Sequence, residues 1–407
     1  MHTLLEARGK IVRKEEVMIK VWGTNETSDE SVSRTVYRLR VAMQSSGGPE
    51  VVETIYNSGF RITAAIRETT MKESSSLNAL THSARPGAIT ALMSAREFLA
   101  RQSVEDIDAA ANAVRLAINL DPSFAAAWAT LAEIRIVQAL RSLRPPREAG
   151  WLAKEATKTA LNIDPQSTSA LAIQGWVRVM IDRDCERGME DLDRAMAIDP
   201  DFWVSNMFRG WVLQAAGRHE ESVTMMRRAL ELNSVSHAVN SILALYLMFS
   251  GNNAEALQVA LDLAKRFPTV DNSQGIASIL ASVNGMHDEA VSFGWRAMEL
   301  APHTPLMHTP LAYALAYAGR HEEAWDVLGA IEKSNLPQPS ASIAPVYLAL
   351  GEPEKAIALL QDACERGVPQ FAWSRDDPRL AALRGNSEVE RLWARIWPRQ
   401  MVDSLAA

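Results

Sequence analysis

Apolar residues recur every three or four positions along most of this 407-residue chain, whereas apolar and polar residues alternate near its N-terminus, over residues 51–63. The first spacing gives a helix one apolar face, and the second gives a β-strand one apolar face. Within 51–63 the alternation is broken by Asn57, Ser58 and Gly59, which are residues that form tight turns. The pattern therefore predicts a mainly α-helical protein with one β-hairpin close to its N-terminus.

Two amphipathic helices are predicted ahead of this hairpin. The first runs through residues 13–22 and stops at Gly23. The second lies within residues 28–44, and its apolar face is formed by Val32, Val36, Leu39 and Met43. Two helices followed by a hairpin have the order of a winged helix–turn–helix, whose second helix enters the major groove of DNA.

After the hairpin region, a short motif that ends in "DP" or a related pair recurs at a fixed period. It ends at Pro122, Pro165, Pro200, Ser234, Pro268 and Pro302, and the spacings after the second are 35, 34, 34 and 34. A period of 34 residues is that of the tetratricopeptide repeat, which is a helix–turn–helix unit. The sequence therefore predicts an α-solenoid built from these repeats.

Inside each unit, a glycine is expected to end the first helix, and a small residue five positions later marks where the two helices approach closely. The glycines are Gly217, Gly251, Gly285, Gly319 and Gly351, and the small residues are Ser222, Ala256, Ala290, Ala324 and Ala356. About eight units are expected between residues 86 and 371, the second lengthened by an insertion around residues 141–150. An amphipathic helix in 386–398 is expected to cap the end of the solenoid.

These elements divide the chain into four parts. We expect a winged-helix domain at 1–66, a polar, Ser/Thr-rich linker at 67–87, a repeat array at 88–371 and a C-terminal capping segment at 372–407. Charge follows the same division, because residues 1–67 hold ten Lys and Arg against eight Asp and Glu, while the rest of the chain holds 32 against 41. A mildly basic module thus precedes an acidic array.

Composition narrows the classes of function. Cys185 and Cys364 are the two cysteines, and their separation without a CxxC or Cys/His grouping favours reduced thiols in a cytoplasm and no structural zinc. No run of about 18 consecutive apolar residues and no secretory leader is evident, so we expect no membrane association. Without a phosphate-binding loop, a nucleophile elbow or a paired metal motif, the sequence predicts no enzyme, no cofactor and no metal.

The order and spacing of three motifs carry a family resemblance. "GKIVRKEEVMIKVWG", "SDESVSRTVYRLR" and "VETIYNSGFRI" resemble the second helix, recognition helix and wing of OmpR/ToxR-type winged-helix regulators, over roughly residues 3–66. Among such proteins, the chain is similar to soluble bacterial regulators that carry helical repeats after the DNA-binding domain. The family places further residues ahead of "LLEARGKIV", so we expect either a start codon upstream of Met1 or a degenerating domain.

The helix of residues 31–38 supplies the candidate DNA-binding residues. Arg34 and Arg38 lie one turn apart and project from the polar side of the helix with Ser31 and Thr35. The resemblance implies that Arg34, Arg38, Ser33 and Thr35 face base edges or phosphates, and that Arg61, after the wing tip, contacts a phosphate. A solvated helix face is the alternative for Arg34 and Arg38 taken alone.

The inner face of the array supplies a second candidate site, a groove for a protein partner. Counting from the end of each repeat, the residues expected to line it are Trp176, Met207, Trp211, Gln214, Met248, Phe249, Tyr313 and Tyr317. Such an aromatic and methionine-rich lining suits an apolar helix or an extended peptide. Packing of these side chains against the neighbouring repeat is the alternative, above all for Trp176 and Trp211.

The sequence therefore predicts a cytoplasmic transcriptional regulator that docks on double-stranded promoter DNA. Its array is expected to bind an effector, a second copy of the chain, or a protein partner such as RNA polymerase. The alternative is a protein-interaction scaffold whose truncated winged-helix module no longer binds DNA. The neutral wing tip at Asn57 and Ser58 and the incomplete first helix favour that alternative.

Overall fold

A computed structural model describes residues 10–22, 32, 33, 36, 52–55, 58–62, 85–101 and 103–395. The chain forms two compact units, Met1–Lys72 and Glu73–Ala407. Their boundary falls inside the segment for which the sequence predicts a linker. Each unit is described by itself.

The first unit contains helix α2 (Lys14–Trp22) and the hairpin of β1 (Val52–Ile55) and β2 (Gly59–Ile62). The strands are antiparallel, with Val52 opposite Ile62 and Thr54 opposite Phe60. The helix ends directly before Gly23, and the hairpin spans the alternating stretch, so both predicted elements are confirmed.

A backbone contact explains why the hairpin turn ends in glycine. Val12 pairs with Phe60 through two N–H···O bonds of 2.9 Å, so the segment before α2 runs along the edge of β2. At Gly59, with φ +139°, a Cβ atom would lie 2.0 Å from the carbonyl oxygen of Val12. Only glycine allows this approach, which ties the hairpin to the start of α2.

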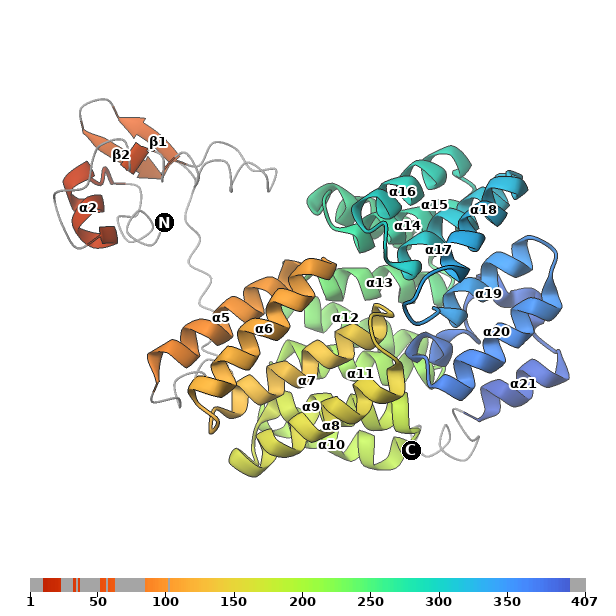
Figure 1. Ribbon diagram of the computed structural model, residues 1–407, viewed down its shortest axis with the longest axis horizontal. Helices are drawn as coiled ribbons and strands as arrows, with labels where there is room; N and C mark the ends of the chain where they lie inside the picture. The colour runs from red at the N-terminus through yellow and green to blue at the C-terminus, as the bar shows by residue number, and fades with distance from the viewer. Residues whose placement is uncertain are drawn as a thin grey trace. The chain divides into compact units, whose positions relative to one another are not determined.

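The second unit is a curved array of helix pairs, which Figure 1 shows in order from α5 to α20. The described residues form eight pairs: α5 (Pro86–Arg101) with α6 (Val104–Leu120), α7 (Ala125–Leu140) with α8 (Pro146–Ile163), α9 (Thr168–Val177) with α10 (Cys185–Ile198), α11 (Trp203–Ala215) with α12 (His219–Leu232), α13 (His237–Phe249) with α14 (Asn253–Arg266), α15 (Asp271–Val283) with α16 (His287–Leu300), α17 (Pro305–Tyr317) with α18 (His321–Glu332), and α19 (Ser340–Ala349) with α20 (Pro353–Arg366). A π-helical turn, η1 (Arg178–Asp182), extends α9. The predicted solenoid is confirmed.

The turn within each regular pair is built as the sequence predicts. All five glycines at these turns have φ between +75° and +83°. After α11, the N–H of Gly217 donates to Gln214 O at 3.0 Å and the N–H of Arg218 donates to Leu213 O at 2.9 Å. This pair of bonds is a Schellman motif, and it satisfies the last carbonyl groups of the helix.

Close packing of the two helices in a pair depends on the small residues that follow these turns. Ser222, Ala256, Ala290, Ala324 and Ala356 are all fully buried. The Ser222 hydroxyl donates to Gly210 O at 2.8 Å, so it is also satisfied. The predicted close approach at this position is therefore confirmed.

After the last pair, the chain turns into the inner side of the array. Two short 3-10 helices, η2 (Pro369–Trp373) and η3 (Pro378–Leu383), precede helix α21 (Ser387–Ala394). Helix α21 packs on α20 and buries Val389, Leu392 and Trp393, as expected of a cap. The predicted boundary between array and capping segment, at residues 371 and 372, lies within η2.

Curvature brings the second helix pair against the end of the array. The guanidinium of Arg147, at the start of α8, donates to Glu365 O at 2.7 Å. The amide of Gln370, in η2, donates to Leu140 O at 2.7 Å. These contacts join segments more than 200 residues apart in sequence, and they enclose the inner side of the array.

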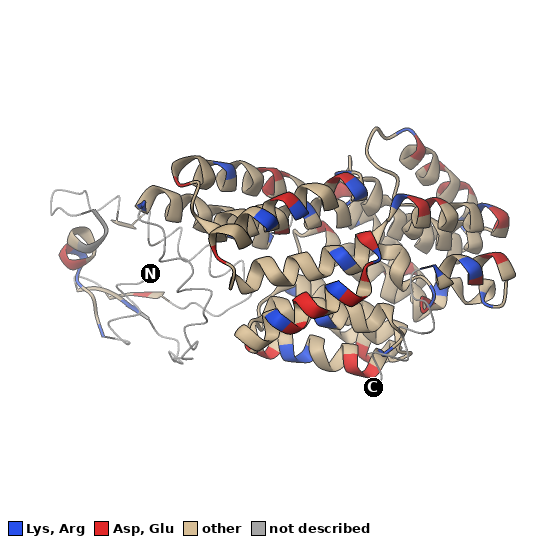
Figure 2. Cartoon of the chain, turned by 90° about the horizontal axis from the view of Figure 1, so that it is seen from below, with Lys and Arg blue, Asp and Glu red and all other residues tan. Residues whose placement is uncertain are grey.

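Acidic side chains gather at the starts of the second helices of several pairs. Glu220 and Glu221 begin α12, Asp288 and Glu289 begin α16, and Glu322 and Glu323 begin α18. Negative charge at a helix N-terminus is stabilised by the helix dipole. Figure 2 shows acidic and basic side chains interspersed over the helices of the array.

Candidate functional site

The helix predicted to read DNA is anchored through its apolar side. Val32, Ser33 and Val36 are helical. Val32 and Val36 are buried in a cluster with Val12, Val17, Met18, Val52 and Phe60, whereas Ser33 is exposed. The core of the module therefore packs α2, the hairpin and this helix together, with Ser33 on the open side. Ser31, Arg34, Thr35 and Arg38 lie outside the described residues.

Arg61, predicted to contact a phosphate, lies on β2 opposite Glu53. Its Nη2 atom is 2.6 Å from Glu53 Oε2, and the two side chains are 42% and 44% exposed. The arginine that is predicted to contact a phosphate is therefore already paired with a carboxylate. An exposed ion pair of this kind is weak, so a phosphate can compete for the guanidinium.

The residues predicted to line the partner groove fall into two groups. Trp176, Gln214, Met248 and Tyr313 are in the interior, each 0–1% exposed, and they present no surface to a partner in this structure. Trp176, for example, packs its ring 5.9 Å from Phe208 and 5.4 Å from Trp211. These side chains are packed inside the array, as the alternative interpretation of the sequence predicted.

Among the other four predicted groove residues, Met207 and Trp211 are also buried, and Trp211 packs against Trp176 of the neighbouring repeat. Met207, Trp211 and Phe249 line a cavity, and Tyr317 is 48% exposed with its ring 4.7 Å from that of Tyr313. The assignment of these residues to partner binding stays a prediction.

Part of the inner face is covered by the chain itself, which the sequence did not indicate. The Trp373 ring of η2 lies 5.3 Å from Trp211 and 6.0 Å from Tyr246. Arg379 of η3 lies 5.3 Å above the Tyr313 ring and pairs with Asp377 at 2.6 Å. The segment Pro369–Leu383 therefore occupies space that an open groove would offer to a partner.

His219 connects this inner segment to a turn of the array. Its Nε2 atom lies 3.6 Å from Asp376, and its Nδ1 atom is 2.8 Å from the amide of Gln214. Burial raises the pKa of Asp376, and His219 opposes that shift. These contacts give His219 and Asp376 a structural role.

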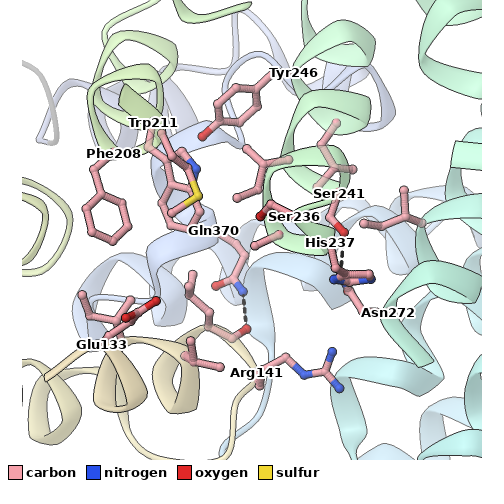
Figure 3. Close-up of a pocket in the computed structure, with 18 of the residues that line it drawn as sticks. Glu133, Arg141, Phe208, Trp211, Ser236, His237, Ser241, Tyr246, Asn272 and Gln370 are labelled. Carbon is pink, nitrogen blue, oxygen red and sulfur yellow. Dashed lines mark hydrogen bonds between the residues drawn. The ribbon is translucent and has the colours of Figure 1, made fainter. Parts of the chain in front are cut away.

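A cavity of about 550 Å³ remains between the inner helices α5 to α19 and η2. Figure 3 shows Phe208, Trp211 and Tyr246 on one side of it and Glu133 and Arg141 on the other. Most of its wall is apolar, with Met207, Ile242 and Ile276 among the lining residues. Its volume lies within the range of small-molecule pockets.

Charged groups nevertheless face this cavity. Glu133 on α7 and Arg96 on α5 both line it and are partly exposed to it. Burial raises the pKa of Glu133, and the nearby Arg96 opposes that shift. Arg141, at the end of α7, forms a buried ion pair with Asp271 at the start of α15.

Sequence reasoning missed this polar lining, although it left a signal. Glu133 interrupts the otherwise apolar run "AAAWATLAEI" of α7. A carboxyl in a helix that is apolar on several faces is costly unless the group is paired or has a role. The segment around Trp373 could have been noticed for its aromatic residues, Phe371 and Trp373, after the last repeat.

Across the helices of the described ranges, none combines the length and the apolarity needed to cross a bilayer.

Comparison with known proteins gives different families for the two units of the chain. Residues 1–62 match the family described as "Transcriptional regulatory protein, C terminal". Over 58 residues, the chain is 41% identical to the transcriptional regulator HilA of Salmonella typhi, a match that covers 14% of this chain and 10% of that protein. The chain thus matches only a tenth of the length of this relative.

The array is similar to other repeat proteins. Residues 205–235 match the tetratricopeptide repeat family. The chain is 25% identical over 220 residues to anaphase-promoting complex subunit 7 of Dictyostelium discoideum, which covers 54% of this chain and 36% of that protein. The crystal structure of the APC/C hetero-tetramer Cut9–Hcn1 superposes with a TM-score of 0.51 at 16% identity, over 80% of this chain and 58% of that one, which shows a shared fold.

The chain therefore joins an N-terminal region that matches the OmpR-type winged-helix family to a solenoid of tetratricopeptide repeats.

Proposed function

We propose that this chain is a bacterial transcriptional regulator that docks on promoter DNA through the helix containing Ser31, Arg34 and Arg38, and that it performs no catalysis. Its array binds an effector, a second copy of the chain or a protein partner such as RNA polymerase. The protein acts in the cytoplasm.

One observation carries the proposal. Val32 and Val36 are buried in the core of the module while Ser33 between them is exposed. Because side chains repeat every 3.6 residues around a helix, anchoring of the valine side directs the polar side of this helix away from the core. Arg34 and Arg38 belong to the polar side in the sequence pattern, as a recognition helix requires.

Charge sets the expected strength of binding. Ten Lys and Arg against eight Asp and Glu in residues 1–67 leave a small positive excess. Phosphate neutralisation supplies most of non-specific affinity, so non-specific binding by the module is weak. Specific binding therefore depends on base contacts from the recognition helix and on a second copy or a polymerase partner.

Fluorescence anisotropy on DNA from the region upstream of the protein's own gene tests this proposal. The full chain is titrated at low and moderate salt beside the Arg34→Ala/Arg38→Ala variant. We expect the substitutions to weaken binding at least about tenfold and to reduce the salt slope by about two, one unit for each lost phosphate contact.

A variant with the same change in net charge provides the control. Arg227→Ala/Arg296→Ala removes two exposed arginines from α12 and α16. It should bind DNA as the unmodified chain does. Equal losses in the two double variants, or no binding by any form, would contradict the proposal.

The Arg61–Glu53 ion pair favours the second candidate function, a protein-interaction scaffold whose module no longer binds DNA. This pair neutralises an arginine that a DNA reader would use. Glu53→Gln distinguishes the two candidates, because it releases Arg61. A DNA reader then binds several-fold more tightly with a salt slope steeper by about one, whereas a scaffold shows no DNA binding with either residue.

A further inference from the structure

The cavity inside the array has the construction of a ligand site. Its wall is formed by the first helices of successive pairs and by η2, which crosses the inner side. Enclosure by both the array and its C-terminal segment leaves a space of about 550 Å³. A pocket of this size accommodates a small organic molecule.

One wall of this cavity suits an apolar body. Phe208 and Trp211 pack at 5.7 Å, and Trp211 and Trp373 pack edge to face at 5.3 Å. Figure 3 shows Phe208, Trp211 and Tyr246 gathered on this side. Aromatic surface arranged in this way binds aliphatic or aromatic groups by burial from water.

Donor groups without partners surround the same space. Arg96 lines the cavity, and no hydrogen bond or ion pair within 4.0 Å joins it to a residue of the described ranges, although the charge of Glu133 acts on it at longer range. Two nitrogens of Arg141, the hydroxyl of Tyr246 and the indole N–H groups of Trp211 and Trp373 also lack partners there, and all are buried. These nitrogens and this hydroxyl have almost no accessible surface, so Arg96, which is partly exposed, is the donor residue of this group that a molecule in the cavity can approach.

Acceptors in the lining are fewer. Gln370 Oε1 and His237 Nδ1 are unpaired, and Glu133 faces the cavity without an ion pair or hydrogen bond to the described part of the chain. Burial raises the pKa of Glu133, which favours its protonated form, and a protonated carboxyl adds another donor. The unpaired donors of the lining outnumber its unpaired acceptors, which favours an incoming ligand that accepts hydrogen bonds.

We propose that this cavity binds a small amphipathic carboxylic acid, whose carboxylate accepts hydrogen bonds from Arg96 and whose apolar body packs against Phe208, Trp211 and Trp373. A guanidinium that no carboxylate of the described residues approaches within 4.0 Å, in a mostly apolar cavity, can recognise this head group through charge-assisted hydrogen bonds. The proposal specifies the effector class within the proposed function. Ligand binding itself does not depend on DNA.

Isothermal titration calorimetry on the full chain tests this assignment with three ten-carbon probes. Decanoate, decylamine and decanol share one alkyl chain and differ in head group. We expect decanoate to bind at one site per chain, with affinity at least about tenfold above either of the other probes. Tryptophan fluorescence should change with the same saturation, because Trp203, Trp211 and Trp373 line the cavity.

Variants locate the site. Arg96→Gln should weaken decanoate binding about tenfold or more, while Arg296→Gln, which removes an exposed arginine of α16, should leave it unchanged. Ala238→Trp fills the cavity from α13 and should abolish binding of decanoate. Far-UV circular dichroism checks that each variant is folded. If Ala238→Trp does not fold, Arg96→Gln still tests the site, because Arg96 is partly exposed and its substitution should not unfold the chain.

Three results would overturn the proposal. They are no saturable binding of decanoate, equal affinity for all three probes, and equal behaviour of Arg96→Gln and Arg296→Gln. The DNA titration described above uses neither the probes nor these variants. If the chain binds decanoate but not DNA, only the proposed regulator function is refuted. If it binds DNA but not decanoate, only the proposed cavity site is refuted.

Discussion

In the pairs from α7–α8 to α19–α20, the first helix buries a larger share of its residues than the second, whereas α5 and α6 bury five residues each. Helix α13, a first helix of 13 residues, buries nine of them, whereas its partner α14, of 14 residues, buries four. The second helices expose acidic starts and a solvated side, as in α12 and α18. The first helices contact their own partner, the neighbouring pair, and in several cases the inner segment or the cavity.

This difference shows why an inner helix face is not automatically a docking surface. In a solenoid open on its inner side, the first helices present one free face to a partner. Here the inner side is occupied by Pro369–Leu383 and by ion pairs that span it, such as Arg141 with Asp271. The array thus uses much of its inner face for its own stability, and a cavity remains beside the inner segment.

The largest expected effect comes from removing the ring that η2 inserts among the first helices. Trp373→Ala should lower the free energy of unfolding by about 3–5 kcal/mol, because the large ring, 8% exposed, leaves a cavity beside Trp211 and Tyr246. Urea denaturation followed by circular dichroism measures this loss. Trp151→Ala, on the exposed side of α8 where the ring is 58% exposed, should cost about 0.5 kcal/mol or less. Similar costs for the two variants would erase the distinction between inner and outer helices.

A second comparison sets a buried ion pair across the inner side against an outer one. Asp271→Asn leaves Arg141 buried without its charged partner and should cost about 3 kcal/mol. Glu323→Gln breaks an exposed pair with Arg320 at the start of α18 and should leave the urea midpoint unchanged within error. If Asp271→Asn is as harmless as Glu323→Gln, the bridge across the array does not stabilise the fold.

Acidification provides a third test. Burial, followed by the charge of Arg141, lowers the pKa of His237 from 6.5 to about 3. The unfolded chain therefore takes up a proton at this residue below pH 6.5 while the folded chain does not, so stability is lost as the pH falls from 6.5 toward 3. The loss from this residue between pH 6.5 and pH 5 is about 2 kcal/mol.

Substitution assigns this acid sensitivity to one side chain. His237→Gln should remove that part of the loss, while His287→Gln, at the exposed start of α16, should leave the pH dependence as it is. Thermal midpoints at pH 6.5 and pH 5 provide the measurement. An unchanged pH dependence in His237→Gln would show that other groups govern acid stability.

The smallest expected effect concerns the turn that joins a first helix to a second. Gly285→Ala should destabilise the chain by about 1 kcal/mol, because alanine is strained at φ +76° although an added Cβ meets no described atom within 4 Å. Gly329→Ala, inside α18 and equally open, should stabilise it by about 0.5–1 kcal/mol, since alanine favours the helix. Calorimetric midpoints that move in the same direction would contradict the role given to the left-handed turn.

Periodicity predicted the repeats because the same turn and the same close helix contact recur in each regular pair. The turn at Gly285 and the small residue Ala290 depend on neighbours within one pair, so their spacing in the sequence carries the information. The hairpin was equally readable from its alternation and from the "NSG" turn. Local structure was therefore predictable in both units.

The segment that occupies the inner side of the array was not predictable from the sequence. Its contacts join residues that are far apart in the chain, and they do not recur from repeat to repeat. Gln370 meets Leu140 across 230 positions, and no repeat or spacing marks the pair. For the same reason, four residues predicted to line a partner groove, Trp176, Gln214, Met248 and Tyr313, are in the interior. The candidate DNA-binding residues came from a resemblance, and among them the structure describes Ser33 and Arg61.

The central claim is that the chain reads DNA through the predicted helix within residues 28–44, and selection from fragmented genomic DNA of the source organism tests it most directly. Fragments retained by the purified chain are sequenced and compared with those retained by Arg34→Ala/Arg38→Ala and by Arg227→Ala/Arg296→Ala. The account predicts that fragments from between genes, sharing one sequence element, are enriched by the unmodified chain and by the second variant but not by the first. Absence of a shared element, or enrichment that survives Arg34→Ala/Arg38→Ala, would contradict it.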